Sequence, residues 1–183
     1  MTPDGLSIEP ATMRDLDEVL AIEEACFSDP WTRKMLTAEL SQNPFAQFLL
    51  AKCLDPISGS AVVAGYFCFW IVFEEVRLMN LAVMAPFRRR GLATRLVCRA
   101  LQFGLDKKAS RAMLEVRASN EAAQALYRGF GFRETARRIR YYSKPEEDAV
   151  LMDLRPLVVG TLCEPSSRQS QEPGHRTTVY GHV

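Results

Sequence analysis

The sequence of 183 residues lacks the features that would assign it to several large classes of protein. Its two histidines, His175 and His182, both lie near the C-terminal end, and its five cysteines form no C-x-x-C pair. No set of His, Cys, Asp and Glu has the spacing of a metal site, so we expect no bound metal. Ser119 has no histidine nearby in the sequence that would activate it as a nucleophile.

Long apolar runs and a large net charge are also missing. The longest apolar run, Ala61 to Phe73, is interrupted by Gly65 and is too short to span a bilayer. A net charge of +1 gives no overall attraction to nucleic acid or to an anionic membrane. The cysteines, at positions 26, 53, 68, 98 and 163, are odd in number and scattered, as is typical of reduced core residues. We therefore expect a soluble cytoplasmic protein without a membrane partner.

What the chain does contain is enough apolar residues, 48% of the total, to bury the core of one ordinary domain. We expect this domain to occupy residues 1–155. Residues 156–183 are rich in Ser, Pro and Gly, so we expect a flexible tail in which only Leu157–Leu162 has the composition to dock.

The hydrophobic periodicity predicts an α/β (α+β) fold. Thr12 and Asp15 form a near capping box for a first helix, and Thr32 caps a second. The predicted helices are Met13–Ala25, Thr32–Ser41, Leu92–Leu105 and Glu121–Arg128, and the predicted strands are Leu6–Pro10, Phe45–Cys53, Ala61–Phe73, Val76–Val83, Ala112–Val116, Phe132–Tyr142 and Ala149–Leu154. Because a helix crosses between Val76–Val83 and Ala112–Val116, these two strands should be parallel within a largely antiparallel sheet.

The segment Arg88–Ala93 (Arg-Arg-Arg-Gly-Leu-Ala) lies where a predicted strand meets a predicted helix. The first N–H groups of a helix have no partners within it, and together with the helix dipole they favour an anion such as a diphosphate. Gly91 and Ala93 would let the oxygens of a ligand approach the backbone closely. The alternative is a sharp turn with a solvated basic edge, and the hexapeptide alone does not decide between the two.

Three blocks of sequence resemble a known family. The motif Arg88-x-x-Gly91-x-Ala93 is similar to the acetyl-CoA signature (Q/R)-x-x-G-x-(G/A) of the GCN5-related N-acetyltransferases (GNAT). The other two blocks resemble the ribosomal-protein-alanine N-acetyltransferase (RimI-type) branch of that family. One is Leu114–Asn120 with Ala125-Leu126-Tyr127 and Gly131-Phe132, and the other is Ile22–Thr32. The resemblance covers about residues 6 to 155.

The resemblance implies the acyl-CoA N-acyltransferase (GNAT) fold, with a mixed sheet that splays at two central parallel strands and is flanked by helices. It implies acetyl-CoA as co-substrate and a protein N-terminus as acceptor, specifically the N-terminal alanine of ribosomal small-subunit protein eighteen. A bulge near residues 81–83 would free an N–H for the thioester oxygen. The implied acetyl-CoA contacts are Leu81, Ala82, Val83, Arg88, Arg89, Arg90, Gly91, Leu92, Ala93, Thr94 and Asn120, of which Asn120 would also cap a helix.

Two residues are candidates for the chemistry of acetyl transfer, which needs a neutral amine and a protonated leaving thiolate. The resemblance assigns Glu115 as the general base and Tyr127 as the general acid, roles that a carboxylate and a phenol can fill. Spacing alone favours simpler interpretations, namely a surface glutamate paired with Arg117 and a half-buried aromatic in a helix. Cys98 follows the apolar rhythm of its helix, so we expect a core residue and direct transfer without an acyl-enzyme.

Four residues are candidates for the acceptor side. Glu23 interrupts the apolar stripe of the first helix, and it is either a locally paired surface carboxylate or part of a substrate groove. The resemblance favours the groove for Glu23 and adds Trp31 from the following loop. It also suggests that Tyr141 and Tyr142 form a wall of the same groove.

The sequence is also compatible with other functions. A lysine side chain or a small-molecule amine could replace the protein N-terminus as acceptor in the same fold. The protein could also be a non-catalytic acyl-CoA sensor or an RNA-associated module, because residues 137–142 mix arginine with tyrosine. Strand alternation, however, would place Arg138 and Arg140 on one solvated face opposite Ile139 and Tyr141, so we expect no nucleic-acid partner.

Overall fold

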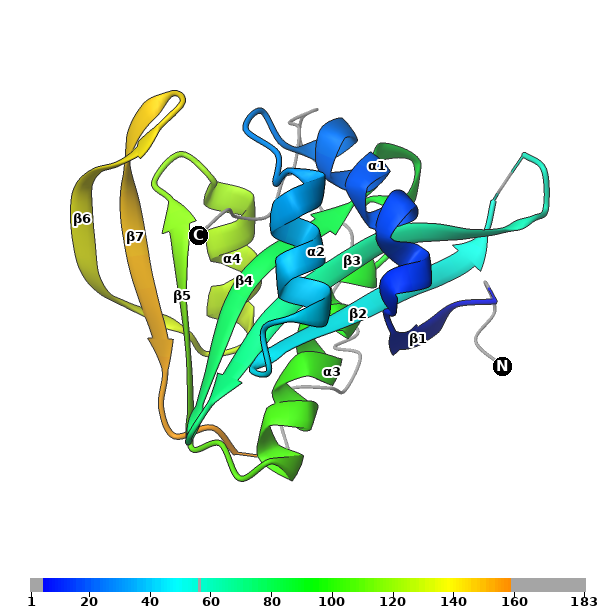
Figure 1. Ribbon diagram of the computed structural model, residues 1–183. Helices are drawn as coiled ribbons and strands as arrows, with labels where there is room; N and C mark the ends of the chain where they lie inside the picture. Colours follow the sequence, from blue (N-terminus) through cyan, green and yellow to red (C-terminus); the bar gives the residue numbers. More distant parts are fainter. Residues whose placement is uncertain (1–4, 56, 159–183) are drawn as a thin grey trace.

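The computed structural model describes residues 5–55 and 57–158, and within them the strands form one seven-stranded sheet (Figure 1). The strand order is β1-β2-β3-β4-β5-β7-β6. The strands are β1 (Ser7–Pro10), β2 (Ala46–Leu54), β3 (Ala61–Val72), β4 (Glu75–Val83), β5 (Arg111–Arg117), β6 (Arg133–Ser143) and β7 (Glu146–Leu154). The helices are α1 (Leu16–Cys26), α2 (Arg33–Ser41), α3 (Leu92–Asp106) and α4 (Glu121–Gly129), with short 3-10 helices η1 (Met13–Asp15) and η2 (Ala85–Phe87).

Helices cover both faces of the sheet. Figure 1 shows α1 and α2 in front of the strands, and α3 and α4 behind them. Alternate side chains of β3 enter the two resulting cores: Phe67 and Phe69 pack on the α3–α4 side, whereas Tyr66 and Cys68 pack on the α1–α2 side. A central strand that is buried on both faces reads as a continuous apolar run, which accounts for the long apolar stretch at 61–73.

The two central strands diverge halfway along their length. Strand β4 pairs in parallel with β5 only from Glu75 to Leu78, opposite Arg111 to Leu114, and beyond that point β5 pairs with β7 alone. A β-bulge lies at the same point: Cys68 of β3 is opposite Asn80 and Phe69 is opposite Leu78, so Met79 is the extra residue. The predicted fold, with its splayed parallel pair, is confirmed, but the bulge precedes residues 81–83 and does not lie within them.

The predicted helix caps are also present. The Thr12 backbone N–H donates to Asp15 Oδ2 at 2.8 Å, and the Thr12 side chain accepts from the backbone in return, which completes the capping box. Thr32 Oγ1 accepts from the backbone N–H of Met35 at 3.3 Å at the start of α2. Leu157, in the segment predicted as tail, is buried and its N–H donates to Ser110 O at 2.8 Å; the remainder of the tail lies outside the described residues.

The predicted alternation of β6 is wrong. Arg138 is opposite Ala149 and Tyr142 is opposite Glu147, so the three residues between them on β6 face a single residue of β7. Within this bulge Arg140 adopts a positive φ of 52°, and its N–H donates to Asp148 Oδ1 at 2.9 Å. The extra residues break the two-residue period and allow Arg138 and Tyr141 to lie near the same carboxylate.

The cysteines match their predicted state in part. Cys26, Cys53 and Cys68 are free and buried, as expected for core thiols. Cys98 is disulfide-bonded, so the expectation of five reduced cysteines is wrong at that position. None of the helices in residues 5–55 and 57–158 has the length and apolar character that crossing a membrane requires.

Replacing Gly65 with alanine is expected to destabilise the sheet next to the splay. A Cβ atom at Gly65 would lie 2.5 Å from the carbonyl oxygen of Ala82 and 3.2 Å from the Cα of Val83, so backbone would have to move. We expect a loss of about 1–3 kcal/mol in the free energy of unfolding, measured by urea denaturation. Gly129→Ala is the matched control, since nothing lies within 4 Å of its Cβ position; a neutral G65A would contradict the tight β3–β4 contact.

Candidate active site

A cavity of about 310 Å³ lies between the start of α3 and helix α4. Its wall contains most of the residues predicted for the diphosphate site, together with three small or apolar residues of α4. The lining residues are Val83, Phe87, Arg88, Arg89, Gly91, Leu92, Ala93, Thr94, Ala122, Ala125 and Leu126. Leu81, Ala82, Arg90 and Asn120, also predicted as acetyl-CoA contacts, are not among them.

The backbone of the turn before α3 is shaped to receive an anion. Gly91 is the N-cap of α3 in the left-handed conformation, with φ 78°, and Arg89 has a positive φ of 64°. These two residues set the course of the backbone into α3, whose dipole adds positive potential at its N-terminus. No atom lies within 4 Å of the position of a Gly91 Cβ, so it is the conformation that calls for glycine. The turn therefore fits the diphosphate of a CoA thioester.

The side chain of Arg88 supports the end of β4 in this structure. Its Nε donates to the carbonyl oxygen of Val83 at 2.8 Å, and its Nη2 lies 3.7 Å from Cys26 Sγ at the end of α1. Arg90 lies over the ring of Phe87, with Cζ 5.6 Å from the ring centroid. The side chains of the three arginines thus have different surroundings.

Arg88→Met is therefore expected to lower stability even without a ligand. Loss of the charged hydrogen bond to Val83 O should cost about 1–2 kcal/mol, visible as a lower Tm of the free protein. Arg89→Met is the control, because no hydrogen bond or ion pair of the Arg89 side chain is seen within the described residues. It should leave the Tm of the free protein unchanged while weakening acetyl-CoA binding. Equal Tm values for the two variants would contradict the assigned role of Arg88.

The segment Leu81–Val83 has no strand partner on its β5 side, although Arg88 Nε already donates to the carbonyl oxygen of Val83. On its other side, Leu81 is opposite Phe67, Ala82 is opposite Tyr66, and β5 is no longer paired with this part of β4. An open strand edge can pair with an extended ligand through main-chain hydrogen bonds. This edge leads directly to the turn before α3, as a pantetheine arm joined to a diphosphate would require.

Glu115 lies on β5, one residue beyond its last pairing with β4. Its neighbours Leu114 and Val116 pack in the α3–α4 core, so alternation turns the Glu115 side chain to the opposite face. Its exposure is 9%, and Oε1 forms an ion pair with Arg138 Nη1 at 2.7 Å. The other oxygen, Oε2, is buried and has no hydrogen-bond partner among the described residues, so it can accept a proton. The pairing of Glu115 with Arg117 suggested by spacing is wrong.

Tyr127 lies in α4 on the other side of the sheet. It is 4% exposed and packs edge-on against Phe132, with ring centroids 5.7 Å apart. The preceding residues Ala125 and Leu126 line the cavity, whereas Tyr127 itself is not among its lining residues and packs in the α3–α4 core. Asn120 caps α4 by accepting from the N–H of Ala123 at 3.1 Å, one of the two roles predicted for it.

The acceptor-side candidates differ strongly in exposure. Tyr141 is 39% exposed, whereas Trp31 and Tyr142 are each 7% exposed and Glu23 is fully buried. Burial, and then the neighbouring Glu115, raise the pKa of Tyr141. Glu23 is therefore not the surface carboxylate suggested as one interpretation, nor does its side chain reach a groove surface. Tyr141 is the candidate best placed to meet a ligand next to Glu115.

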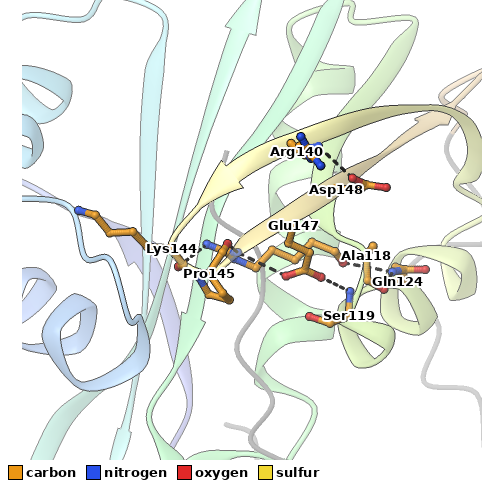
Figure 2. A network of polar contacts seen from close by, with 9 residues as sticks. Ala118, Ser119, Gln124, Arg140, Lys144, Pro145, Glu147 and Asp148 are labelled. Carbon is orange, nitrogen blue, oxygen red and sulfur yellow. Dashed lines mark hydrogen bonds and ion pairs between the residues drawn. The ribbon is translucent and has the colours of Figure 1, made fainter.

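A polar network ties the β6–β7 hairpin to the loop before α4 (Figure 2). Glu147 on β7 accepts from the N–H of Ser119 and from Arg117 Nη1 at 3.4 Å. Arg117 also donates to the carbonyl oxygens of Lys144 at 3.0 Å and Pro145 at 3.2 Å, and its Cζ lies 4.1 Å from the centroid of the Tyr142 ring. This network fixes the end of β5 that carries Glu115.

A further ion pair joins the tip of the β6–β7 hairpin to the loop between α1 and α2. Lys144 Nζ lies 3.4 Å from Asp29 Oδ1, which connects the β6–β7 turn to the α1–α2 loop across the front of the sheet. Both side chains are more than half exposed, so this pair contributes little to stability. It shows that the two segments flanking the splay on this face approach each other.

Comparison with known proteins identifies the family. The profile of the acetyltransferase (GNAT) family matches residues 16–132. The chain belongs to this family. It is 34% identical over 146 residues to ribosomal protein bS18-alanine N-acetyltransferase of Salmonella typhimurium, an alignment that covers 76% of this chain and 90% of that protein.

Solved structures with the GNAT fold agree with the topology. The crystal structure of the ribosomal-protein-S18-alanine N-acetyltransferase of Escherichia coli matches with a TM-score of 0.72 at 28% identity, covering 85% of this chain and 96% of that one. A chain of the NatC complex bound to Gag peptide and CoA matches with a TM-score of 0.73 at 25% identity, covering 82% and 98%. The overall fold of this GNAT domain is thus shared with these solved acetyltransferase structures.

Sequence reasoning missed several residues that shape the site. Arg138 was assigned to a solvated face, yet it holds Glu115. Glu147 and Asn80 were not singled out, although Asn80 is a polar residue within an otherwise apolar strand end and is fully buried. Such an interruption of a buried run is a signal that could have been followed.

Proposed function

We propose that this GNAT protein transfers the acetyl group of acetyl-CoA to the N-terminal α-amine of a protein, with the N-terminal alanine of ribosomal protein bS18 as acceptor. The main support is its similarity, over about three quarters of its length, to enzymes named for that reaction. The residues of the site fit this chemistry. An anion-binding turn and cavity lie on the α3–α4 side, and a carboxylate with one unbonded oxygen lies on the other side.

The proposed reaction proceeds by direct attack of the amine on the thioester carbonyl. An α-amine has a pKa of about 7.7–8.0, so near neutral pH a mild base suffices to take its proton. Glu115 Oε2 accepts this proton, directly or through water, while Arg138 holds Oε1. Tyr127 donates its phenolic proton to the sulfur as the carbon–sulfur bond breaks, and the edge of β4 at Leu81–Val83 holds the pantetheine arm.

The alternatives receive less support. A lysine ε-amine has a pKa of about 10.4 and is a harder substrate for a single carboxylate base. An RNA-binding surface on β6 is disfavoured, because three of its four arginines are paired with carboxylates: Arg137 with Glu134 at 2.7 Å, Arg138 with Glu115, and Arg140 with Glu146 at 3.2 Å. With a ribosomal protein as acceptor, we also propose a cytoplasmic location.

The proposal is tested by incubating the protein with acetyl-CoA and a peptide that carries the N-terminal sequence of bS18. Mass spectrometry should locate one acetyl group on the α-amine of the terminal alanine. Two control peptides separate the acceptors: one with a blocked N-terminus and free lysines, and one with a free N-terminus and blocked lysines. Acetylation of the first control and not of the second would refute N-terminal transfer.

A further inference from the structure

A buried carboxylate on α1 gathers hydrogen-bond donors from three different elements. Glu23 is fully buried. Its Oε2 accepts from the backbone N–H of Trp31 at 2.7 Å, and its Oε1 accepts from Asn80 Nδ2 at 3.0 Å and from the Tyr66 hydroxyl. Burial raises the pKa of this carboxyl, while the three donors oppose that effect. Burying a carboxyl group costs free energy unless it is well hydrogen-bonded, so a carboxyl group at this position calls for an explanation.

The three donors come from segments that meet around the splay. Trp31 lies in the loop between α1 and α2, which approaches the β6–β7 hairpin through Asp29 and Lys144. Asn80 follows the bulged Met79 on β4, at the point where β4 leaves β5. The side chain of Glu23 therefore accepts hydrogen bonds from the α1–α2 loop and from β4, the strand that leads to the turn before α3.

The network also leaves one atom unsatisfied. Because only the NH₂ group of Asn80 can donate to a carboxylate, its amide orientation is fixed, with Oδ1 on the opposite side. Asn80 Oδ1 is buried and has no hydrogen-bond partner among the described residues. A network built only for stability would not leave a buried carbonyl oxygen unbonded, since that costs free energy. The arrangement is better explained by the need to hold the bulge in one conformation.

We propose that Glu23 is a positioning residue that locks the α1–α2 loop to the bulge of β4. It thereby fixes the acceptor side of the site relative to the strand that holds the acetyl donor. The role rests on the proposed function, because it concerns the alignment of amine and thioester. It needs an acceptor-only side chain: a glutamine at this position offers one acceptor oxygen to three donors and brings two N–H groups of its own.

The test compares Glu23→Gln with Glu39→Gln. Glu39 on α2 is the matched control, since it accepts from Asn43 Nδ2 at 2.8 Å and Trp70 Nε1 at 2.8 Å but touches neither the α1–α2 loop nor the bulge. We expect E23Q to lower kcat/KM for the acceptor by about tenfold or more, because a buried hydrogen bond to a charged group is lost. The KM for acetyl-CoA should stay at the wild-type value, and E39Q should change neither parameter. Tyr66→Phe removes only one of the three donors, so it should lower kcat/KM for the acceptor substrate less than E23Q does. It replaces E23Q in the test if E23Q fails to fold.

Amide hydrogen exchange provides a readout that does not depend on activity. E23Q should speed exchange in two separate segments together, the loop at 28–32 and the bulge at 78–81, whereas E39Q should speed it in neither. An E23Q protein in which only one of these segments exchanges faster, or in which the KM for acetyl-CoA rises as much as that for the acceptor, would overturn the proposal. If the wild-type protein acetylates no protein N-terminus but the two segments still loosen together, the proposed function fails while the positioning role stands.

Discussion

Replacing Glu115 with glutamine is expected to lower kcat by about 10²- to 10⁴-fold, the range associated with loss of a general base. Glutamine has nearly the same shape but cannot take a proton from the amine. The KM for acetyl-CoA should change little, since the cavity and turn on the α3–α4 side do not include Glu115. Steady-state rates with the bS18 peptide, followed by release of free thiol, give both parameters.

A matched control separates lost chemistry from a lost ion pair. Glu134→Gln removes a pairing with Arg137 of the same length, 2.7 Å, on the same strand as Arg138 but away from the splay. It should leave both kcat and Tm near those of the wild type, because both side chains of this pair are more than a third exposed. A Glu115→Gln enzyme with the wild-type kcat would exclude Glu115 as the base.

Tyr127→Phe is expected to lower kcat by about 10²-fold or more, because the departing thiolate loses its proton donor. The substitution keeps the ring and therefore its edge-on contact with Phe132 at 5.7 Å. Stability should fall far less than it would for Tyr127→Leu, which also removes the aromatic contact. Measuring kcat and Tm for both variants separates the effect of the hydroxyl group from that of the ring. A Tyr127→Phe enzyme with the wild-type kcat would contradict the general-acid role.

Much of the fold could be predicted because its signals are local. The caps at Thr12 and Thr32 and the apolar stripe of α3 are read from neighbouring residues, and the helix between two strands forces a parallel pair. The turn before α3 is local in the same sense, since the glycine at the start of the helix is visible in the sequence.

The features that could not be predicted depend on distant contacts. Two of the three hydrogen-bond partners of Glu23 lie 43 and 57 residues away, so its position in α1 could not show that the carboxylate is bonded and not exposed. The bulges at Met79 in β4 and at residues 139–141 in β6 insert extra residues, and the one in β6 changes which side chains share a face. The bulge in β6 is also the reason why Arg138 was placed on a solvated face. The bond from Arg88 to Val83 O spans only five residues, but the sequence carries no signal for it.

A crystal structure with coenzyme A and the bS18 peptide tests the account most directly. We predict that the diphosphate lies against the backbone of Arg89–Thr94, with the sulfur within hydrogen-bond reach of the Tyr127 hydroxyl. The terminal amine of the peptide should lie on the α1–α2 side, next to Glu115 Oε2. A nucleotide bound away from this turn, or a Tyr127 hydroxyl directed away from the sulfur, would contradict the account.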